Sequence, residues 1–154
     1  MDAIVTSIIA VLGTLLGSTV THVFQQRSAR RTEHNTRLER LRQERLDVYG
    51  TYAGLLVEFR QAMLHHWFCE HEDRDADDEV ALRRLSFETR SNAQHALFRL
   101  QLITDDRELL AVAADVFTKI GTIDRAADRP DVVARRDASR EAIDTFVETA
   151  RRHV

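Results

Sequence analysis

Residues that interrupt helices are scarce in this sequence. Its 154 residues include five glycines and a single proline, Pro130. Because glycine and proline most often end or bend helices, their scarcity favours long uninterrupted helices. Strictly alternating β-branched clusters are also missing beyond the N-terminus, so strands have little support. The sequence therefore predicts an all-α fold.

Cysteine and lysine are nearly absent as well. The single cysteine, Cys69, excludes an internal disulfide. Lys119 is the only lysine among 22 basic residues, and with abundant alanine this arginine bias indicates a GC-rich genome such as that of an actinobacterium. The net charge of −3 argues against general nucleic-acid binding, so we expect no nucleic-acid partner.

Motifs that carry catalysis are missing too. The sequence has no glycine-rich phosphate loop and no nucleophile elbow with an oriented base. One cluster has ligand chemistry: His65 and Cys69 are spaced one helical turn apart, which suits a shared metal ion. The alternative, which we favour, is an ordinary polar helix end beside the hydrophobic Trp67 and Phe68. We expect no enzyme, no cofactor and no metal, and we expect His95 to be a partly buried polar residue.

The N-terminal segment is the most informative part of the chain. Residues 3–24 carry no formal charge when His22 is neutral, and as a helix they rise about 33 Å, close to the hydrocarbon thickness of a bilayer. A cleaved signal would begin with basic residues, but Asp2 stands there. We predict an uncleaved transmembrane anchor over residues 1–24, with a buried core helix as the alternative.

An arginine-rich segment follows the anchor. Residues 25–45 contain seven arginines against three glutamates, beginning with Arg27, Arg30 and Arg31. By the positive-inside rule, we expect the N-terminus outside and the rest of the chain in the cytoplasm, below the cytoplasmic membrane. These arginines also suit contact with anionic lipids. The segment predicts a juxtamembrane helical stalk that continues the anchor.

Two patterns predict self-association. Gly13, Gly17 and Thr21 form a small-residue row that lets membrane helices approach closely. Further along, apolar residues alternate in steps of three and four, apart from one gap that Arg45 fills. This heptad seam consists of Leu38, Leu41, Val48, Tyr52, Leu55 and Phe59.

The C-terminal part predicts a helical bundle over residues 46–154. A second apolar row of Tyr49, Leu56 and Met63 widens the first helix into a bundle member, where Gly50 and Gly54 admit a close neighbour or mark a bend. A second helix, with Leu85 among its buried residues, runs to about Ile103. A third begins at an Asp105–Glu108 capping box or at Thr104, and a fourth begins near Pro130 and buries Val147. We expect these four segments to pack antiparallel.

The chain also resembles a known family. The stretches "SIIAVLGTLLGSTVTHVFQQR", "RLRQERLDVYGTYAG" and "NAQHALFRLQLITDD" are similar to those of KilB-like small membrane proteins of actinobacteria, which belong to Streptomyces conjugative plasmids and related chromosomal copies. The resemblance implies a role in plasmid transfer or spread between mycelial compartments. It implies no catalytic residues.

Together these features predict a non-enzymatic, single-pass membrane protein. It would self-associate, as a homo-oligomer, into a scaffold or channel component. The alternative is a monomeric membrane-tethered helical module that recruits a cytoplasmic or membrane protein partner. A metal-dependent sensor at His65 and Cys69 is a more distant third hypothesis.

Overall fold

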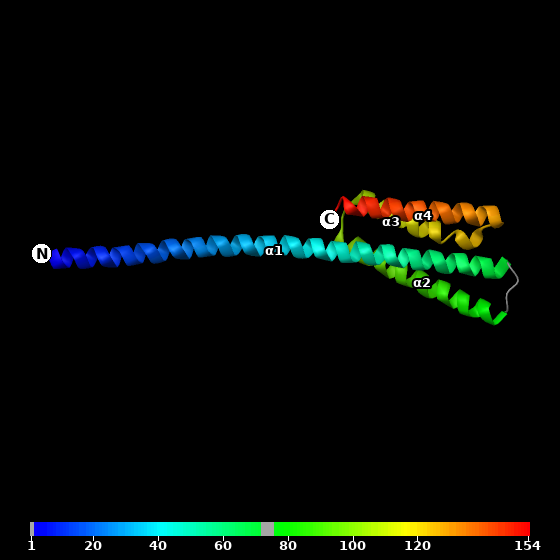
Figure 1. The fold of residues 1–154 in the computed structure, drawn as a ribbon, viewed down its shortest axis with the longest axis horizontal. Coiled ribbons are helices and arrows are strands. Elements are labelled where there is room, and N and C mark those ends of the chain that lie inside the picture. Colours follow the sequence, from blue (N-terminus) through cyan, green and yellow to red (C-terminus); the bar gives the residue numbers. More distant parts are fainter. Residues whose placement is uncertain (1, 72–75) are drawn as a thin grey trace. The chain divides into compact units, whose positions relative to one another are not determined.

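The computed structural model describes the backbone of residues 2–71 and 76–154 and the side chains of residues 36–71 and 80–154. The described backbone forms four α-helices, α1 (Asp2–His71), α2 (Ala76–Ile103), α3 (Arg107–Ile120) and α4 (Arg129–Arg151), labelled in Figure 1, with a short 3-10 helix, η1 (Ile123–Arg125), before α4. No strand occurs among the residues with described backbone. The predicted all-α fold is confirmed.

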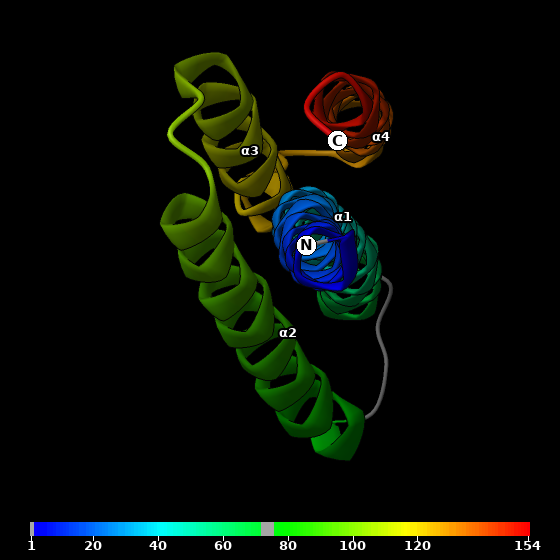
Figure 2. The same cartoon turned by 90° about the vertical axis from the view of Figure 1, so that its left-hand side faces the viewer.

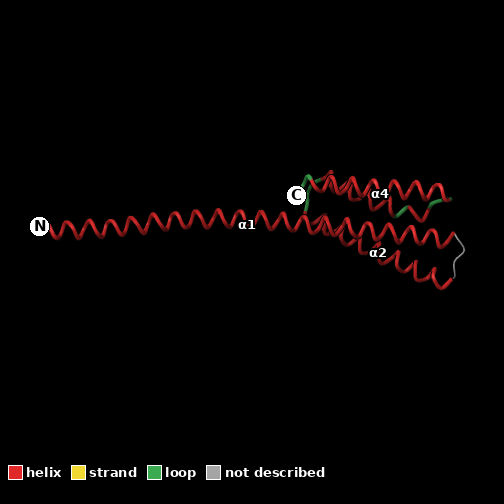
Figure 3. The backbone as a smooth tube through the Cα atoms, viewed as in Figure 1, coloured by secondary structure: helices red, strands yellow, loops and turns green. Residues whose placement is uncertain are grey.

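The chain divides into two compact units, Met1–Gln43 and Glu44–Val154. This division lies close to the predicted boundary between the stalk and the bundle. In the second unit, consecutive helices run in opposite directions, as the backbone tube in Figure 3 shows. Figure 2, viewed along α1, shows α2, α3 and α4 arranged around it. The predicted antiparallel bundle is therefore present.

The core of the bundle forms around the part of α1 from Val48 to Trp67. The ring of Tyr52 meets the ring of Phe146 on α4 edge to face, with centroids 5.2 Å apart, and Phe59 lies 5.5 Å from Phe117 on α3. Burial of such rings gives the largest hydrophobic stabilisation per residue. The largest fully buried apolar side chains come from every helix of the bundle: Tyr52, Leu56, Phe59, Leu100, Leu109, Val116, Ile120, Ile123, Val132 and Phe146.

Two buried hydrogen bonds join α1 to α3 and to the loop that follows η1. The hydroxyl of Tyr52 donates to the carbonyl oxygen of Ala113 at 2.9 Å, and the indole nitrogen of Trp67 donates to the carbonyl oxygen of Ala126 at 2.9 Å. Without its hydrogen bond, each of these buried polar atoms would be unpaired, which would destabilise the fold by about 1–3 kcal/mol. Trp67 is thus a buried hydrophobe at the end of the bundle, as predicted.

The ends of the helices correct one prediction and confirm another. The N-cap of α3 is Asp106, whose Oδ1 accepts from the backbone nitrogen of Leu109 at 2.8 Å, so the predicted Asp105 cap is wrong. Because α3 begins one residue later than expected, Glu108 does not occupy the third helical position that a capping box needs. At α4, Asp128 is the N-cap and Pro130 lies in the first turn, as predicted.

Three side chains differ from their predicted burial. Leu85, Val147 and His95 are exposed. On α2, Thr89, Ala93 and Leu100 occupy the centre of the buried face, so Leu85 falls at its edge and His95 lies outside it. On α4, Phe146 and Ala150 face the core, and the neighbouring Val147 points past it. The spacing of apolar residues in the sequence predicts which face of each helix is buried, but it does not predict how wide that buried face is.

Candidate functional site

The membrane prediction concerns a part of the chain whose side chains are not described. Among the side chains that are described, no helix offers a stretch that is long and apolar enough to cross a membrane. The predicted anchor, with Gly13, Gly17 and Thr21, lies outside those residues. So do the predicted lipid and topology residues Arg27, Arg30 and Arg31.

The heptad seam on α1 has two different environments. Within the bundle unit, Val48, Tyr52 and Phe59 are buried, and Leu55 is partly buried against the same core. These residues pack against helices of their own chain. Within the first unit, Leu38 and Leu41 are 53% and 44% exposed. From Val48 onward, the seam is therefore occupied inside one chain and is not free to join two chains.

Gly50 and Gly54 of α1 face open space. A Cβ atom built at Gly50 or Gly54 would meet no other atom within 4 Å, and both residues are exposed. The close neighbour that their spacing suggested is therefore not among the described residues. Packing against Tyr49 or Tyr52 does not explain them either, because both tyrosines point into the core.

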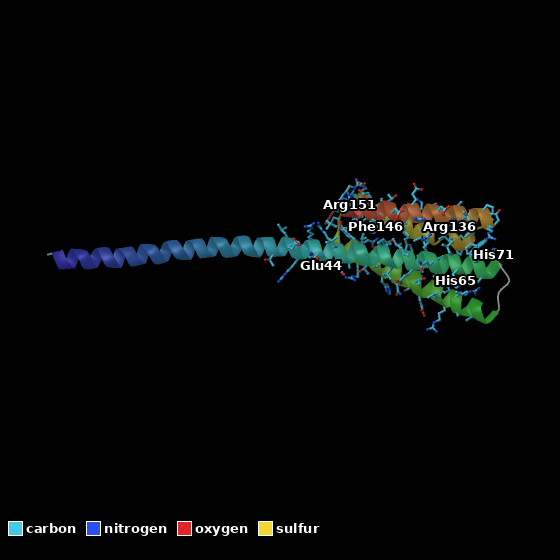
Figure 4. All side chains as sticks on the ribbon, viewed as in Figure 1. Glu44, His65, His71, Arg136, Phe146 and Arg151 are labelled. Carbon is cyan, nitrogen blue, oxygen red and sulfur yellow. The ribbon has the colours of Figure 1, made fainter. Side chains whose placement is uncertain are left out.

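His65 and Cys69, the two residues of the weak metal candidate, differ in exposure. His65 is exposed whereas Cys69 is buried, and Figure 4 shows His65 and His71 near the C-terminal end of α1. The ring of His71 stacks on Trp67 at 4.2 Å, and its Nδ1 lies 2.9 Å from the carbonyl oxygen of Trp67. Among the side chains that the structure describes, no group of three or more His, Cys, Asp or Glu residues is placed to hold a metal ion.

A small cleft that the sequence did not reveal lies between α1, α2 and η1. Its volume is about 290 Å³. The ring nitrogen Nε2 of His66 is buried there without a hydrogen-bond partner. The cleft is lined by Met63, His66, Arg83, Ser86, Phe87, Arg90 and Asp124. It mixes basic and apolar groups, but its residues come together only through the packing of three separate elements.

Charged groups gather where α1 meets α4. The Arg60 guanidinium donates to the carbonyl oxygen of Arg136 at 3.5 Å. Burial lowers the pKa of Arg60, and the nearby charges of Arg140 and Arg136 lower it further. Asp137 forms an exposed ion pair with Arg136 at 2.9 Å, and this hydrogen bond lowers the pKa of Asp137. Exposed pairs of this kind contribute little to stability.

The most prominent uncovered surface is an apolar row on α2, which we call the outer stripe. It consists of Val80, Phe87, Phe98 and Leu102, whose side chains are 73%, 68%, 52% and 87% exposed. The sequence spacing predicts one buried apolar row on α2, and the outer stripe is a second row outside that prediction. The signal that reveals it is a second set of apolar residues at helical spacing on the opposite side of the helix.

Comparison with known proteins identifies the bundle. A family model described as KilB plasmid transfer protein matches residues 46–154, which is most of the chain and coincides with the bundle unit. No curated protein and no solved structure matches the chain. Since the match covers more than half of the sequence, the chain belongs to the KilB plasmid transfer protein family.

Proposed function

We propose that the chain is a non-enzymatic, single-pass membrane protein that self-associates as a scaffold or channel component in plasmid transfer. The observation that carries this proposal is the family match, which spans the helical bundle. The exposed outer stripe of α2 supports association, because several large apolar side chains exposed on one face of a helix are typical of interaction sites.

The membrane part of the proposal rests on the sequence. The uncharged run over residues 3–24 is long enough to span a bilayer, and the arginines after it favour a cytoplasmic bundle. The family match is compatible with an origin in an actinobacterial plasmid, which stays a prediction.

Topology can be tested by thiol labelling of intact cells. Cys69 is buried and is a poor reporter, so we would place a cysteine at the exposed Thr118 in a Cys69→Ala background. With a membrane-impermeant maleimide, we expect labelling only after permeabilisation. Labelling of intact cells would place the bundle outside and overturn the proposed orientation.

Self-association can be tested by co-isolation. Two copies with different affinity tags would be expressed together, and the membrane fraction would be solubilised in detergent. We expect one tag to co-isolate the other copy, whereas copies mixed only after solubilisation control for later exchange. A failure to co-isolate would favour the alternative function, a monomeric membrane-tethered module that recruits another protein.

A further inference from the structure

The two sides of α2 differ in what covers them. At about 100° per residue, the four residues of the outer stripe fall within about 60° of one another around the helix axis. The buried residues Thr89, Ala93 and Leu100 lie on the opposite side, against the core of the bundle. α2 is therefore apolar on two faces, and its own chain covers only one of them.

The outer stripe has the spacing of a helix–helix contact. The residues along it alternate in steps of four and three through Val80, Arg84, Phe87, Ser91, Gln94 and Phe98. These are the positions that face a partner in a pair of packed helices, and three of the six, Val80, Phe87 and Phe98, are apolar. We propose that the outer stripe pairs with the same stripe of a second copy of this chain, with the two α2 helices parallel and in register. The inference deepens the proposed self-association by naming its surface.

Parallel pairing covers the apolar residues best. In that arrangement each of Val80, Phe87 and Phe98 meets its own copy across the two-fold axis, and Leu102 lies beside this contact. An antiparallel arrangement that sets Phe87 against Phe98 of the second copy sets Leu102 against Arg83. It also leaves Val80 beyond the end of the partner helix, which stops at Ile103. The parallel arrangement therefore sets apolar side chains against one another more fully than this antiparallel register does.

The charges beside the stripe favour the same arrangement. Arg83 and Glu88 are five residues apart and lie on opposite edges of the stripe, so in a parallel pair each Arg83 faces the Glu88 of the other copy. Arg84 lies nearer the centre, where it would approach its own copy. Its guanidinium already pairs with Glu88 at 2.8 Å, which offsets part of that repulsion.

The parallel arrangement also allows both chains of the pair to be anchored in the same membrane. Figure 4 labels Glu44 at the start of the bundle segment of α1. A two-fold axis parallel to α2 places the Glu44 residues of both copies at the same end of the pair. Both chains can then leave the paired bundles toward a single membrane, whereas an antiparallel pair would send them in opposite directions.

Disulfide crosslinking of the full-length protein tests the arrangement. In the Cys69→Ala background, Val80→Cys should give a disulfide-linked dimer under mild oxidation. In the antiparallel alternative, the two copies of residue 80 lie about 37 Å apart, too far for a disulfide. Thr118→Cys, on the exposed side of α3, serves as the control that should not crosslink.

Substitutions in the stripe test the contact itself. Adding Phe87→Glu and Phe98→Glu to the Val80→Cys protein should abolish the crosslink. The matched control, Val57→Glu with Val147→Glu, changes exposed valines on α1 and α4 and should leave it unchanged. Glu88→Arg should weaken crosslinking roughly fivefold, and adding Arg83→Glu should restore it. Circular dichroism would check that each variant keeps its helical content.

The outcomes separate this inference from the proposed function. Crosslinking at residue 80 that depends on Phe87 and Phe98 supports the parallel pair. Co-isolation of two tagged copies without this crosslink would overturn the parallel pair and leave self-association standing. Loss of both co-isolation and crosslinking would overturn both, and the stripe would then bind a different partner.

Discussion

One apolar seam on α1 has two different environments. Leu38 and Leu41, in the first unit, are exposed, whereas Val48, Tyr52 and Phe59, in the bundle unit, are buried against α3 and α4. The spacing of the residues is the same in both stretches. Periodicity therefore predicts that a helix has an apolar face, but it does not tell whether the covering helix comes from the same chain.

The largest effect should come from truncating the buried part of the seam. Phe59→Ala removes a ring that is fully buried beside Phe117, so we expect it to lower the free energy of unfolding by about 3–5 kcal/mol. Leu41→Ala, on the exposed part, should change it by less than about 0.5 kcal/mol. Urea denaturation of the full-length protein measures both. Similar losses would show that Leu41 is also covered.

The buried hydroxyl of Tyr52 gives the next effect. Tyr52→Phe removes its hydrogen bond to Ala113 and should cost about 1 kcal/mol. Burial raises the pKa of Tyr52 well above its ordinary value near 10. The protonated hydroxyl of Tyr52 therefore contributes its full stabilisation below a pH of about 10. This stabilisation is lost as the pH rises toward the folded-state pKa. Stability of the wild type should fall more steeply between pH 9 and 11, roughly, than that of Tyr52→Phe. Parallel slopes would contradict this prediction.

Two neighbouring aspartates before α3, Asp105 and Asp106, allow a matched comparison, because only Asp106 is the N-cap. Asp106→Ala should lower the free energy of unfolding by about 1 kcal/mol, because the backbone nitrogen of Leu109 loses its acceptor. Asp105→Ala should have almost no effect, since Asp105 is exposed and does not cap the helix. Thermal denaturation of the two variants compares them directly. A larger loss from Asp105→Ala would restore the cap that the sequence predicted.

The smallest expected effect is an increase in stability. Gly54→Ala adds a methyl group that meets no atom within 4 Å, and alanine favours a helix by about 0.8–1 kcal/mol over glycine. We therefore expect a small increase in the free energy of unfolding, measured by urea denaturation. A decrease, or reduced co-isolation of tagged copies, would show that another helix approaches α1 at this glycine.

The sequence predicted much of the bundle. Helix spacing placed the buried row of Tyr52, Leu56 and Phe59, and the Pro130 signal located the start of α4 within its first turn. It misplaced the α3 cap by one residue, because Asp105 and Asp106 are equivalent as side chains and only the backbone conformation separates them.

The candidate surface was harder to predict. Val80, Phe87, Phe98 and Leu102 share α2 with a buried row, and composition does not say which row the neighbouring helices cover. The orphaned nitrogen of His66 depends in the same way on how α1, α2 and η1 meet. Such features follow from tertiary packing, so they appear only once the helices are placed.

The most direct test of self-association is the molar mass of the detergent-solubilised full-length protein, measured by light scattering with the detergent contribution subtracted. We predict a discrete oligomer of at least two chains, with a mass that falls when Phe87→Glu and Phe98→Glu remove the apolar stripe. A wild-type protein that stays monomeric across the accessible concentration range would contradict the proposed self-association.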